Sequence, residues 1–494
     1  MKKRATCIIL LAAMLCTVSC GGKEVLPVTE PTNENTTVSE EVTKAPEIIS
    51  EALPKADYND HEFKFLSTDS TTTGYFCYEF DAEQLTGEIM NDAVYERNMA
   101  VEDRFNISIT KLVSGSYVEQ FKSSVMAGED SYDVLVASSS TVMQNSTMYG
   151  LAVDELPYVD IDRDWWDRMV MEQSALGGRN YALSGDINLI DDDSIWVIYF
   201  NKRLAEENKI GDLYKMVYDG KWTLDALRVA CADATRDLDG DGTLDYKDQW
   251  GLVASSNNAE SMLWSGGGMM GKLKSDGSME ITLDSERNIN VLSKIYDVFS
   301  AKDSVLVIDR DIPGSVGDMN NWTYSYTMFK EGRALFFGYC LYTLPNFRDM
   351  EDEFGYLPCP KYDEDQADYV SIAQSWVATS LLVPKSASDP ERTSVILEAM
   401  ASSSQHYITP AYYNVVLTRK YSRDNESSAI IDILRKNRCF DLVYTYNFGG
   451  ARSINRDLIA ESNTIASSIA SLKPAVQTAY EDTYQQILDS KSVQ

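Results

Sequence analysis

The stretch YALSGDINLIDDDSIWVIYFNK, residues 181–202, decides the fold. Its acidic first half leads into the run 195–200, IWVIYF, in which all six residues are β-branched or aromatic. Such a run predicts a strand buried on both faces, and a helical pattern opens directly after it at Asn201 and Lys202. Single cores stop growing at about 250–300 residues, so a chain of 494 residues is expected to form two lobes. We expect the backbone to pass from one lobe to the other here, beside a ligand cleft.

Composition excludes some classes of function. The formal net charge is −32, and a surface this acidic repels phosphate backbones, which argues against nucleic acid as a partner. There are only two histidines, His61 and His406, and no HExxH sequence, which argues against a zinc site based on histidine. Five cysteines follow Cys20 at scattered spacings without a CxxC pair. They predict buried free thiols rather than a disulfide framework.

The N-terminal region is typical of an exported protein. Residues 1–19 combine a basic start, KKR, with an apolar segment too short for a lasting membrane span. The following TVSCG resembles a bacterial lipoprotein cleavage box with Cys20 as the lipidated residue; plain secretion with cleavage nearby is the alternative. Residues 20–56 are rich in Pro, Thr, Glu and Ser. We expect them to form a disordered acidic tether, because they have little apolar surface to bury.

A βαβαβ pattern opens the folded body. Strands are predicted at 61–66, 107–113 and 132–137, and helices from about residue 87 and from residue 117. This alternation predicts a parallel sheet, and a strand order of 2-1-3 would create a ligand-binding switch point at the carboxyl ends of strands 1 and 3. Two hydroxyl-rich loops, 67–74 and 138–141, follow these strands. Asp69, Ser138 and Ser139 are therefore candidate ligand contacts, although Ser and Thr are common in any loop.

An acidic loop at 237–248, DLDGDGTLDYKD, has the spacing of a calcium site. Its oxygen ligands would come from five aspartates and one backbone carbonyl, with Gly242 at the sharp turn: Asp237, Asp239, Asp241, Thr243, Asp245 and Asp248. A helix is predicted before the loop and a strand after it, unlike an EF-hand. A structural Ca²⁺ is the prediction, and an acidic turn without a tightly bound ion is the alternative.

Several segments together resemble one protein family. They are GEIMNDAVYERN, GEDSYDVLV, IWVIYFNK, GKWTLDAL, FKEGRALFFGY, FGYLPCPKYDEDQ and VATSLLVPKSA. In this order they resemble the extracellular solute-binding proteins of bacterial ABC importers, the family that includes maltose-binding protein. The resemblance implies a type II periplasmic-binding-protein-like α/β fold, in which two lobes close on a small solute, usually a carbohydrate. It also implies a monomer without enzymatic activity that is anchored outside the cytoplasm and delivers its ligand to a membrane permease.

The resemblance implies three crossings between the lobes, at 182–200, 371–383 and 444–453. Lobe one would comprise residues 57–190 and 380–445, and lobe two residues 195–370 and 450–494. Sugar rings bind to aromatic planes and to planar hydrogen-bonding groups. Candidate contacts are Asp186, Trp196, Trp264, Trp322, Tyr339, Tyr342 and Trp376, of which Tyr339 and Tyr342 follow the family segment FKEGRALFF. The simpler interpretation of each aromatic residue is that it belongs to a core.

Two other classes of function stay open. A secreted carbohydrate hydrolase would need two carboxylates about 5–10 Å apart, and among 76 acidic residues some pair can meet that geometry. No GxSxG, histidine–metal or nucleotide-loop motif is present. A surface adhesion or sensor module could use the same two-lobe clamp without transport.

Overall fold

The computed structural model describes residues 48–68, 80, 82–188, 193–412 and 425–492. These residues belong to one compact unit, Glu47–Gln494. The predicted signal peptide, Cys20, the candidate contact Asp69 and most of the predicted tether lie outside the described residues.

Where the predicted tether is described, it differs from the expectation. The Ser50 amide donates to Ser402 Oγ at 3.2 Å, and Leu53 is buried in a hydrophobic cluster. Ser50 and Leu53, which the prediction places in the tether, therefore pack onto the body.

The first sheet has the strand order β14-β3-β1-β2. Its strands are β1 (His61–Ser67), β2 (Ile107–Val113), β3 (Val134–Ser138) and β14 (Thr379–Leu382). β1 pairs in parallel with both β2 and β3, so the sheet has the 2-1-3 order that places a switch point at the carboxyl ends of strands 1 and 3. β14 enters from late in the chain and pairs antiparallel with β3.

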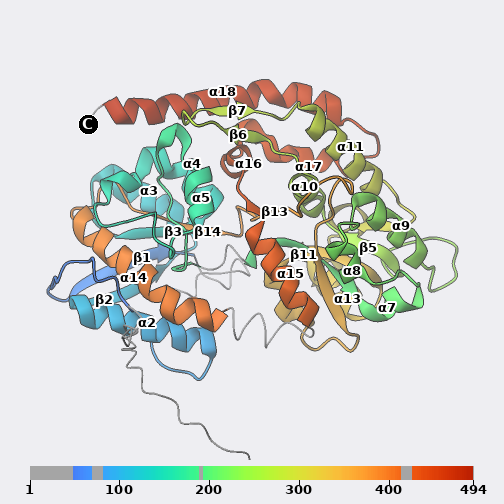
Figure 1. Cartoon of the computed structure of the whole chain (residues 1–494), viewed down its shortest axis with the longest axis horizontal. Helices are drawn as coiled ribbons and strands as arrows, with labels where there is room; N and C mark the ends of the chain where they lie inside the picture. The colour runs from blue at the N-terminus through green and yellow to red at the C-terminus, as the bar shows by residue number, and fades with distance from the viewer. Residues whose placement is uncertain (1–47, 69–79, 81, 189–192, 413–424, 493–494) are drawn as a thin grey trace, which may run out of the picture. The chain divides into compact units, whose positions relative to one another are not determined.

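Helices cover this sheet, and two of them are the helices that the periodicity predicts from about residue 87 and from residue 117. They include α2 (Ile89–Phe105), α3 (Tyr117–Ala127), α4 (Ser139–Tyr149) and α14 (Pro390–Ala411). The face of α2 that carries Met90, Val94, Val101 and Phe105 at helical spacing is buried, and α14 packs against α2 (Figure 1). The loop predicted at 138–141 is instead the end of β3 and the start of α4. The Ser138 side chain accepts from the Thr141 amide at the helix N-terminus, an arrangement in which serine is favoured.

The second sheet has the order β12-β4-β11-β5-β8. Its strands are β4 (Trp196–Asn201), β5 (Trp250–Ala254), β8 (Val305–Val307), β11 (Ala334–Cys340) and β12 (Phe354–Pro358). Every residue of β4 is buried, which confirms the strand predicted from IWVIYF. Its two neighbours run antiparallel to it. Asn201 then caps α7 (Lys202–Glu207) by accepting from the Leu204 amide.

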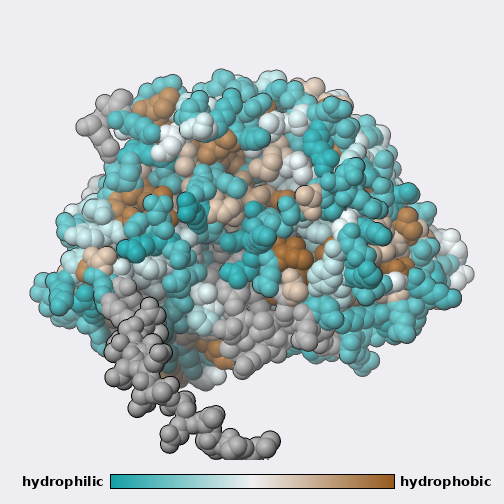
Figure 2. All heavy atoms as spheres, viewed as in Figure 1, coloured by the Kyte–Doolittle hydropathy of each residue, from teal (hydrophilic) through white to brown (hydrophobic). Residues whose placement is uncertain are grey.

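The remaining elements surround these two sheets. Further helices are α8 (Leu213–Tyr218), α9 (Leu224–Ala234), α10 (Ser256–Ser265), α11 (Glu286–Phe299), α13 (Asn321–Lys330), α15 (Asn425–Lys436) and α18 (Ile465–Ser492). Short elements are α5 (Arg168–Gln173), β6 (Gly271–Leu273), β7 (Met279–Ile281), η4 (Leu341–Phe347), β13 (Ser371–Ile372), β15 (Arg438–Cys439), α16 (Leu442–Tyr446), η6 (Phe448–Ser453) and α17 (Ile454–Asp457). The face drawn in Figure 2 is largely hydrophilic, in keeping with the excess of acidic residues.

Two chain segments connect the sheets and pair with each other. Leu183 exchanges backbone hydrogen bonds of 3.0 and 2.9 Å with Leu381 of β14, and Ile195 forms a bridge with Ala373 just before β4. The first segment therefore leaves the first sheet and enters the second, and the later segment returns. The whole is a mixed α/β fold with helices against both sheets. The residue boundaries of the two lobes stay a prediction.

The cysteines and the flanks of the acidic loop follow the sequence. Cys231, Cys340, Cys359 and Cys439 are buried free thiols, as predicted. The acidic loop is preceded by α9 and followed by β5, so the departure from an EF-hand is also confirmed.

Candidate functional site

The structure brings four of the predicted aromatic residues into one group. Trp196 of β4, Trp322 of α13, Tyr339 of β11 and Tyr342 of η4 form the first aromatic group. Tyr339 lies at its centre, with ring centroids 5.6 Å from Trp196, 5.8 Å from Trp322 and 5.7 Å from Tyr342. The antiparallel register of β11 and β4 sets this arrangement, because it places Tyr339 opposite Val197, next to Trp196. Tilted and edge-to-face contacts of this kind hold the rings rigidly.

The four residues of the first aromatic group differ in solvent exposure. Trp196 and Tyr339 are 2% and 7% exposed, whereas Trp322 and Tyr342 are half-buried. Burial raises the pKa of Tyr339 far above its ordinary value, so its hydroxyl stays neutral and accepts a hydrogen bond of 3.2 Å from Tyr342 Oη. The partly exposed rings of Trp322 and Tyr342 are the ones that can receive a ligand from solvent.

Trp196 carries an unused donor. Its indole Nε1–H is buried and has no hydrogen-bond partner among the described residues. A buried N–H without an acceptor costs about 1–3 kcal/mol. An acceptor from outside the described residues would remove this cost. The hydroxyl oxygen of a bound solute can accept such a hydrogen bond.

Polar side chains meet where the predicted crossings lie together. Gln374 donates its backbone amide to Ser194 O at 3.2 Å, which ties the crossing 371–383 to the crossing 182–200. The Ser140 amide donates to Ser375 O at 2.8 Å, and Ser140 Oγ donates to Thr445 O at 2.8 Å. The N-terminus of α4 is thereby fixed to the second and third crossings. The third is helical here, since 444–453 is formed by α16 and η6.

Arg452 completes this junction. Its Nη2 donates to Ser140 Oγ at 2.6 Å and to Ser375 Oγ at 2.9 Å, and its Nε donates to Tyr444 O at 2.9 Å. The guanidinium also stacks on the Tyr444 ring, 4.8 Å from its centroid. One side chain therefore joins α4, the crossing 371–383 and α16.

A second aromatic group lies at this junction and consists of Trp264, Trp376 and Tyr444. Trp264 and Tyr444 are edge-to-face with centroids 4.7 Å apart, and Trp376 hydrogen-bonds to the Tyr444 side chain. Trp264 is 1% exposed and its Nε1 donates to Asp441 at 3.0 Å. Its ring faces are covered by protein, so the structure places Trp264 in the core, whereas Trp376 is half-buried.

Sequence reasoning missed two buried polar residues beside this junction. The side-chain amide of Gln374 is buried, and neither its Oε1 nor its Nε2 has a partner among the described residues. Glu260 of α10 is also buried, with an unpartnered Oε1. Burial raises its pKa well above the ordinary value, against the opposing effect of the Arg452 charge. The signal for Gln374 was available, because it interrupts an otherwise apolar and hydroxyl-bearing crossing. No signal in sequence marked Glu260.

Three other predicted contacts do not join the aromatic groups through their described bonds. Ser138 caps α4. Ser139 is buried, and its Oγ donates to Ala378 O at 3.1 Å and lies 2.8 Å from Ser380 Oγ. Asp186 lies in a turn whose backbone pairs with Trp165 O at 2.9 Å. The helix α4 begins directly after β3 ends at Ser138. The Ser138 hydroxyl therefore caps this helix, and the Ser139 hydroxyl connects it to the segment that contains β14.

The acidic loop brings together three of its six predicted ligands. Carboxylate oxygens of Asp237, Asp239 and Asp248 lie within 4.8 Å of one another. Asp248 is buried, and it accepts from the Leu238 and Asp245 amides, both at 2.8 Å. The Asp245 carboxylate instead pairs with Lys247 Nζ at 3.0 Å. The converging oxygens suit a hard cation such as Ca²⁺.

The Asp241 carboxylate accepts from the Thr243 amide at 2.7 Å. Asp241 is not among the three carboxylates that converge.

Comparison with solved structures defines the class of fold. No protein-family model matches the sequence. No curated protein sequence matches it either. The fold is nevertheless the two-lobe α/β fold of the solute-binding proteins of ABC transporters, because structures of this class match nearly along their whole length.

Three of these structures are representative. An ABC substrate-binding protein from Listeria monocytogenes in complex with cycloalternan has a TM-score of 0.53 at 11% identity, covering 86% of this chain and 99% of that one. The cyclic α-maltosyl-1,6-maltose binding protein of Arthrobacter globiformis scores 0.55 at 13% identity, covering 86% and 100%. UgpB from Mycobacterium tuberculosis in complex with glycerophosphocholine scores 0.55 at 14% identity, covering 79% and 96%.

In the part of the chain that the structure describes, no helix combines the length and apolarity needed to cross a bilayer.

Proposed function

We propose that this protein is the extracytoplasmic solute-binding subunit of an ABC importer and that it captures a carbohydrate. The observation that carries the proposal is the match of the fold to solute-binding proteins over 96–100% of their chains. Two of the three cited structures are named for cyclic oligosaccharides and the third for glycerophosphocholine. The neighbours are binding proteins rather than enzymes, which favours capture over hydrolysis.

The chemistry at the junction supports a polyol ligand. Half-buried rings at Trp322, Tyr342 and Trp376 offer planes for the apolar face of a sugar ring. Trp196, Gln374 and Glu260 have buried donors or acceptors without a partner among the described residues, and groups of this kind give specificity for hydroxyls. Binding between segments that cross from one sheet to the other would couple the ligand to hinge closure.

A thermal-shift screen of the mature protein tests this function. Mono- and oligosaccharides, glycerophosphodiesters and short peptides are added separately, and any stabilising solute is then titrated by calorimetry. A ligand of the native state raises the melting temperature in proportion to ln(1 + [L]/Kd). We expect one carbohydrate class to do so. Hydrolysis of the same glycans would instead identify a hydrolase, and no response to any small solute would favour an adhesion or sensor module.

The membrane anchor and the permease partner belong to the same proposal. Acyl chains on Cys20 would contribute about 0.8 kcal/mol of membrane affinity per buried methylene and hold the body near a permease. Cys20→Ser is expected to move the protein from the membrane fraction to the soluble fraction, while leaving ligand binding unchanged. Recovery of wild type and variant in the same fraction would contradict lipidation. Co-purification of the wild-type protein with a permease complex tests the partner.

We also propose a structural Ca²⁺ in the acidic loop, held by Asp237, Asp239 and Asp248 with further oxygens from the loop. Their convergence supports it. The ion would neutralise repulsion among the carboxylates and fix the connection between α9 and β5.

A further inference from the structure

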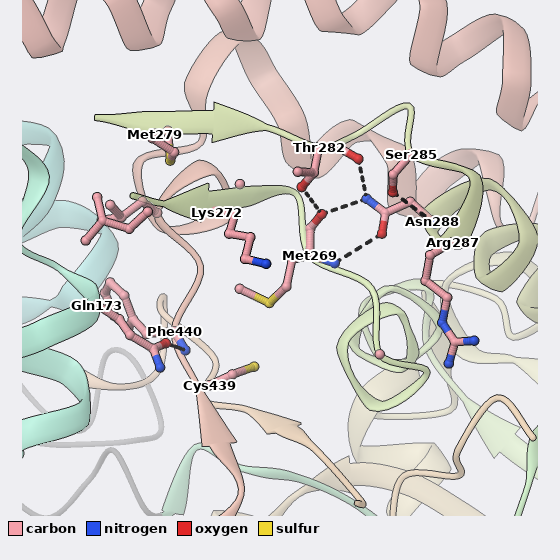
Figure 3. A pocket seen from close by; sticks show the side chains of 14 residues that line it. Gln173, Met269, Lys272, Met279, Thr282, Ser285, Arg287, Asn288, Cys439 and Phe440 are labelled. Atoms are coloured by element: carbon pink, nitrogen blue, oxygen red, sulfur yellow. Dashed lines mark hydrogen bonds between the residues drawn. The ribbon is translucent and has the colours of Figure 1, made fainter. Parts of the chain in front are cut away.

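A pocket of about 480 Å³ lies apart from the first aromatic group (Figure 3). It is formed by the end of α5, the loop and strand 267–273, β7, the start of α11 and the segment 439–442. None of its lining residues was a candidate ligand contact in the sequence. Its volume falls within the range of about 300–1,000 Å³ that small-molecule sites occupy.

The walls of this pocket are mainly apolar. Met269, Leu273, Met279, Phe440 and Leu442 contribute to the lining, and Figure 3 shows the side chains of Met269, Lys272 and Cys439 pointing toward the same central space. Thioether and aromatic side chains of this kind adapt to an apolar ligand body. The pocket can therefore hold a chain or ring without polar groups.

Hydrogen bonds hold one wall in a fixed shape. The buried Asn288 accepts from the Met269 amide at 3.1 Å and donates to Met269 O at 2.6 Å and to Thr282 O at 2.9 Å. On the opposite side, Gln173 Oε1 accepts from the Phe440 amide at 2.7 Å. These side-chain to backbone bonds are satisfied within the protein, so the pocket exists before any ligand enters. Preorganisation of this kind lowers the cost of binding.

Two cations at the pocket have no acidic partner. Lys272 and Arg287 both line it, and neither forms an ion pair with a carboxylate of the described residues. Arg287 donates from Nε to Gly266 O and from Nη2 to Gln366 Oε1, both at 3.0 Å, and stacks 4.5 Å from the Tyr362 ring centroid. Its charge is held in place but not neutralised.

The pocket lining contains basic side chains but no carboxylate. With 76 acidic and 44 basic residues, carboxylates are in excess, yet two basic side chains share one pocket without one. The N-terminus of α11, a helix of 14 residues capped by Ser285, adds partial positive charge at the same wall. Neutral sugar hydroxyls require neither cation. The lining combines apolar walls with two basic side chains and contains no carboxylate. Glu280 lies directly opposite Lys272 in the β6–β7 register, outside this lining. A lining of this kind fits an amphipathic anion.

We propose that this pocket binds a small organic anion, with its carboxylate or phosphate head at Lys272 and its apolar body against Met269, Met279 and Phe440. This goes beyond carbohydrate capture and does not depend on it. The pocket also adjoins the junction of the crossings. Its residues Phe440 and Leu442 flank Asp441, whose carboxylate accepts from Trp264 Nε1 at 3.0 Å and from the Met270 amide at 2.6 Å. A ligand in the pocket would therefore affect the position of Asp441 and, through it, of Trp264 in the second aromatic group.

Isothermal titration calorimetry with n-hexyl phosphate tests the proposal on the mature protein. Hexanoate, hexanol and inorganic phosphate serve as comparison ligands. We expect one site for hexyl phosphate or hexanoate, with weaker binding of hexanol, which lacks charge, and of inorganic phosphate, which lacks an apolar body. Affinity should fall as salt rises, because the contact is ionic. No measurable binding of either anion, or equal binding of hexanol, would overturn the proposal.

Variants locate the site. Lys272 is exposed at the pocket, so Lys272→Gln should fold normally and weaken anion binding about tenfold, equivalent to one lost charge contact of about 1.4 kcal/mol. Lys272→Glu should abolish it. Lys274→Gln is the matched control, because Lys274 is also exposed, lies two residues away and does not line the pocket. Equal affinity in wild type and Lys272→Gln, or equal losses in Lys272→Gln and Lys274→Gln, would contradict the assignment.

Discussion

Arg452 Nη2 lies 2.9 Å from Ser375 Oγ, and this hydrogen bond joins the chain segment that returns to the first sheet with the helical segment near the C-terminus. The same nitrogen reaches Ser140 Oγ at 2.6 Å. Three regions far apart in sequence are therefore held at one point. When two lobes close on a ligand, a few residues at their connection undergo the conformational change.

Arg452→Met is expected to lower the free energy of unfolding by about 2–4 kcal/mol. It removes several hydrogen bonds and leaves Glu260 buried without the nearby positive charge that opposes its neutralisation. Urea denaturation with far-UV detection measures the change. Arg456→Gln is the control, because Arg456 is exposed in the adjoining α17 and should change stability by less than about 0.5 kcal/mol. Similar stability of the two variants would argue against a structural role for the Arg452 contacts.

Trp322→Ala is expected to weaken carbohydrate binding about tenfold with little loss of stability, because its half-buried ring offers a stacking plane worth about 1–1.5 kcal/mol. Tyr342→Phe should have a smaller effect, since it keeps the ring and removes only the hydroxyl that contacts Tyr339. Calorimetry with the sugar identified by thermal shift gives both affinities. Tyr218→Ala, at an exposed position of α8, is the control. Unchanged affinity in Trp322→Ala would remove the first aromatic group from the binding site.

Glu398 is expected to make the protein less stable as the pH rises from about 4.5 to about 7. Burial raises the pKa of its carboxyl to about 7, although hydrogen bonds from Trp166, the Asp160 amide and Trp165 lower it. A raised native pKa stabilises the protonated form. The contribution is therefore complete below the unfolded pKa and is lost as the pH passes the native value, an effect on the order of 3 kcal/mol.

The comparison of Glu398→Gln with wild type at pH 5 and pH 8 measures this effect. The wild-type protein should lose more unfolding free energy between these pH values than Glu398→Gln does, because the amide does not titrate. Glu391→Gln is the matched control, since Glu391 is exposed on the same helix, α14, and should keep the wild-type dependence. A pH dependence that is identical in wild type and Glu398→Gln would contradict the role of this carboxyl.

Chelation of calcium is expected to lower the melting temperature, and Asp237→Asn should abolish the difference between chelated and calcium-loaded protein. The reason is that an ion bound only by the native state stabilises it, and Asp237 is one of the three converging carboxylates. Differential scanning calorimetry with EGTA and with added CaCl₂ measures both. Asp233→Asn, on the exposed face of α9, should respond like wild type. A melting temperature independent of calcium in the wild-type protein would leave the loop as an acidic turn.

Periodicity and composition determined much of the first sheet. The alternation at 61–66 and the spacing of Met90, Val94 and Val101 depend only on neighbours within one strand or helix, so β1 and α2 could be predicted closely. IWVIYF similarly determined that β4 is buried, because a run without a polar face has no side to present to water. The helix before the acidic loop and the strand after it could also be predicted from local sequence patterns.

Only the tertiary structure decided which distant residues meet. Trp196, Trp322 and Tyr339 lie on three elements, and their contact depends on the register of β4 with β11, which no local pattern encodes. The same holds for Arg452 with Ser140 and Ser375, for the burial of Trp264, and for the presence of Lys272 and Arg287 in one pocket lining. Local patterns report whether a residue is apolar or charged. The packing of segments hundreds of residues apart decides whether that residue becomes core, hinge or binding surface.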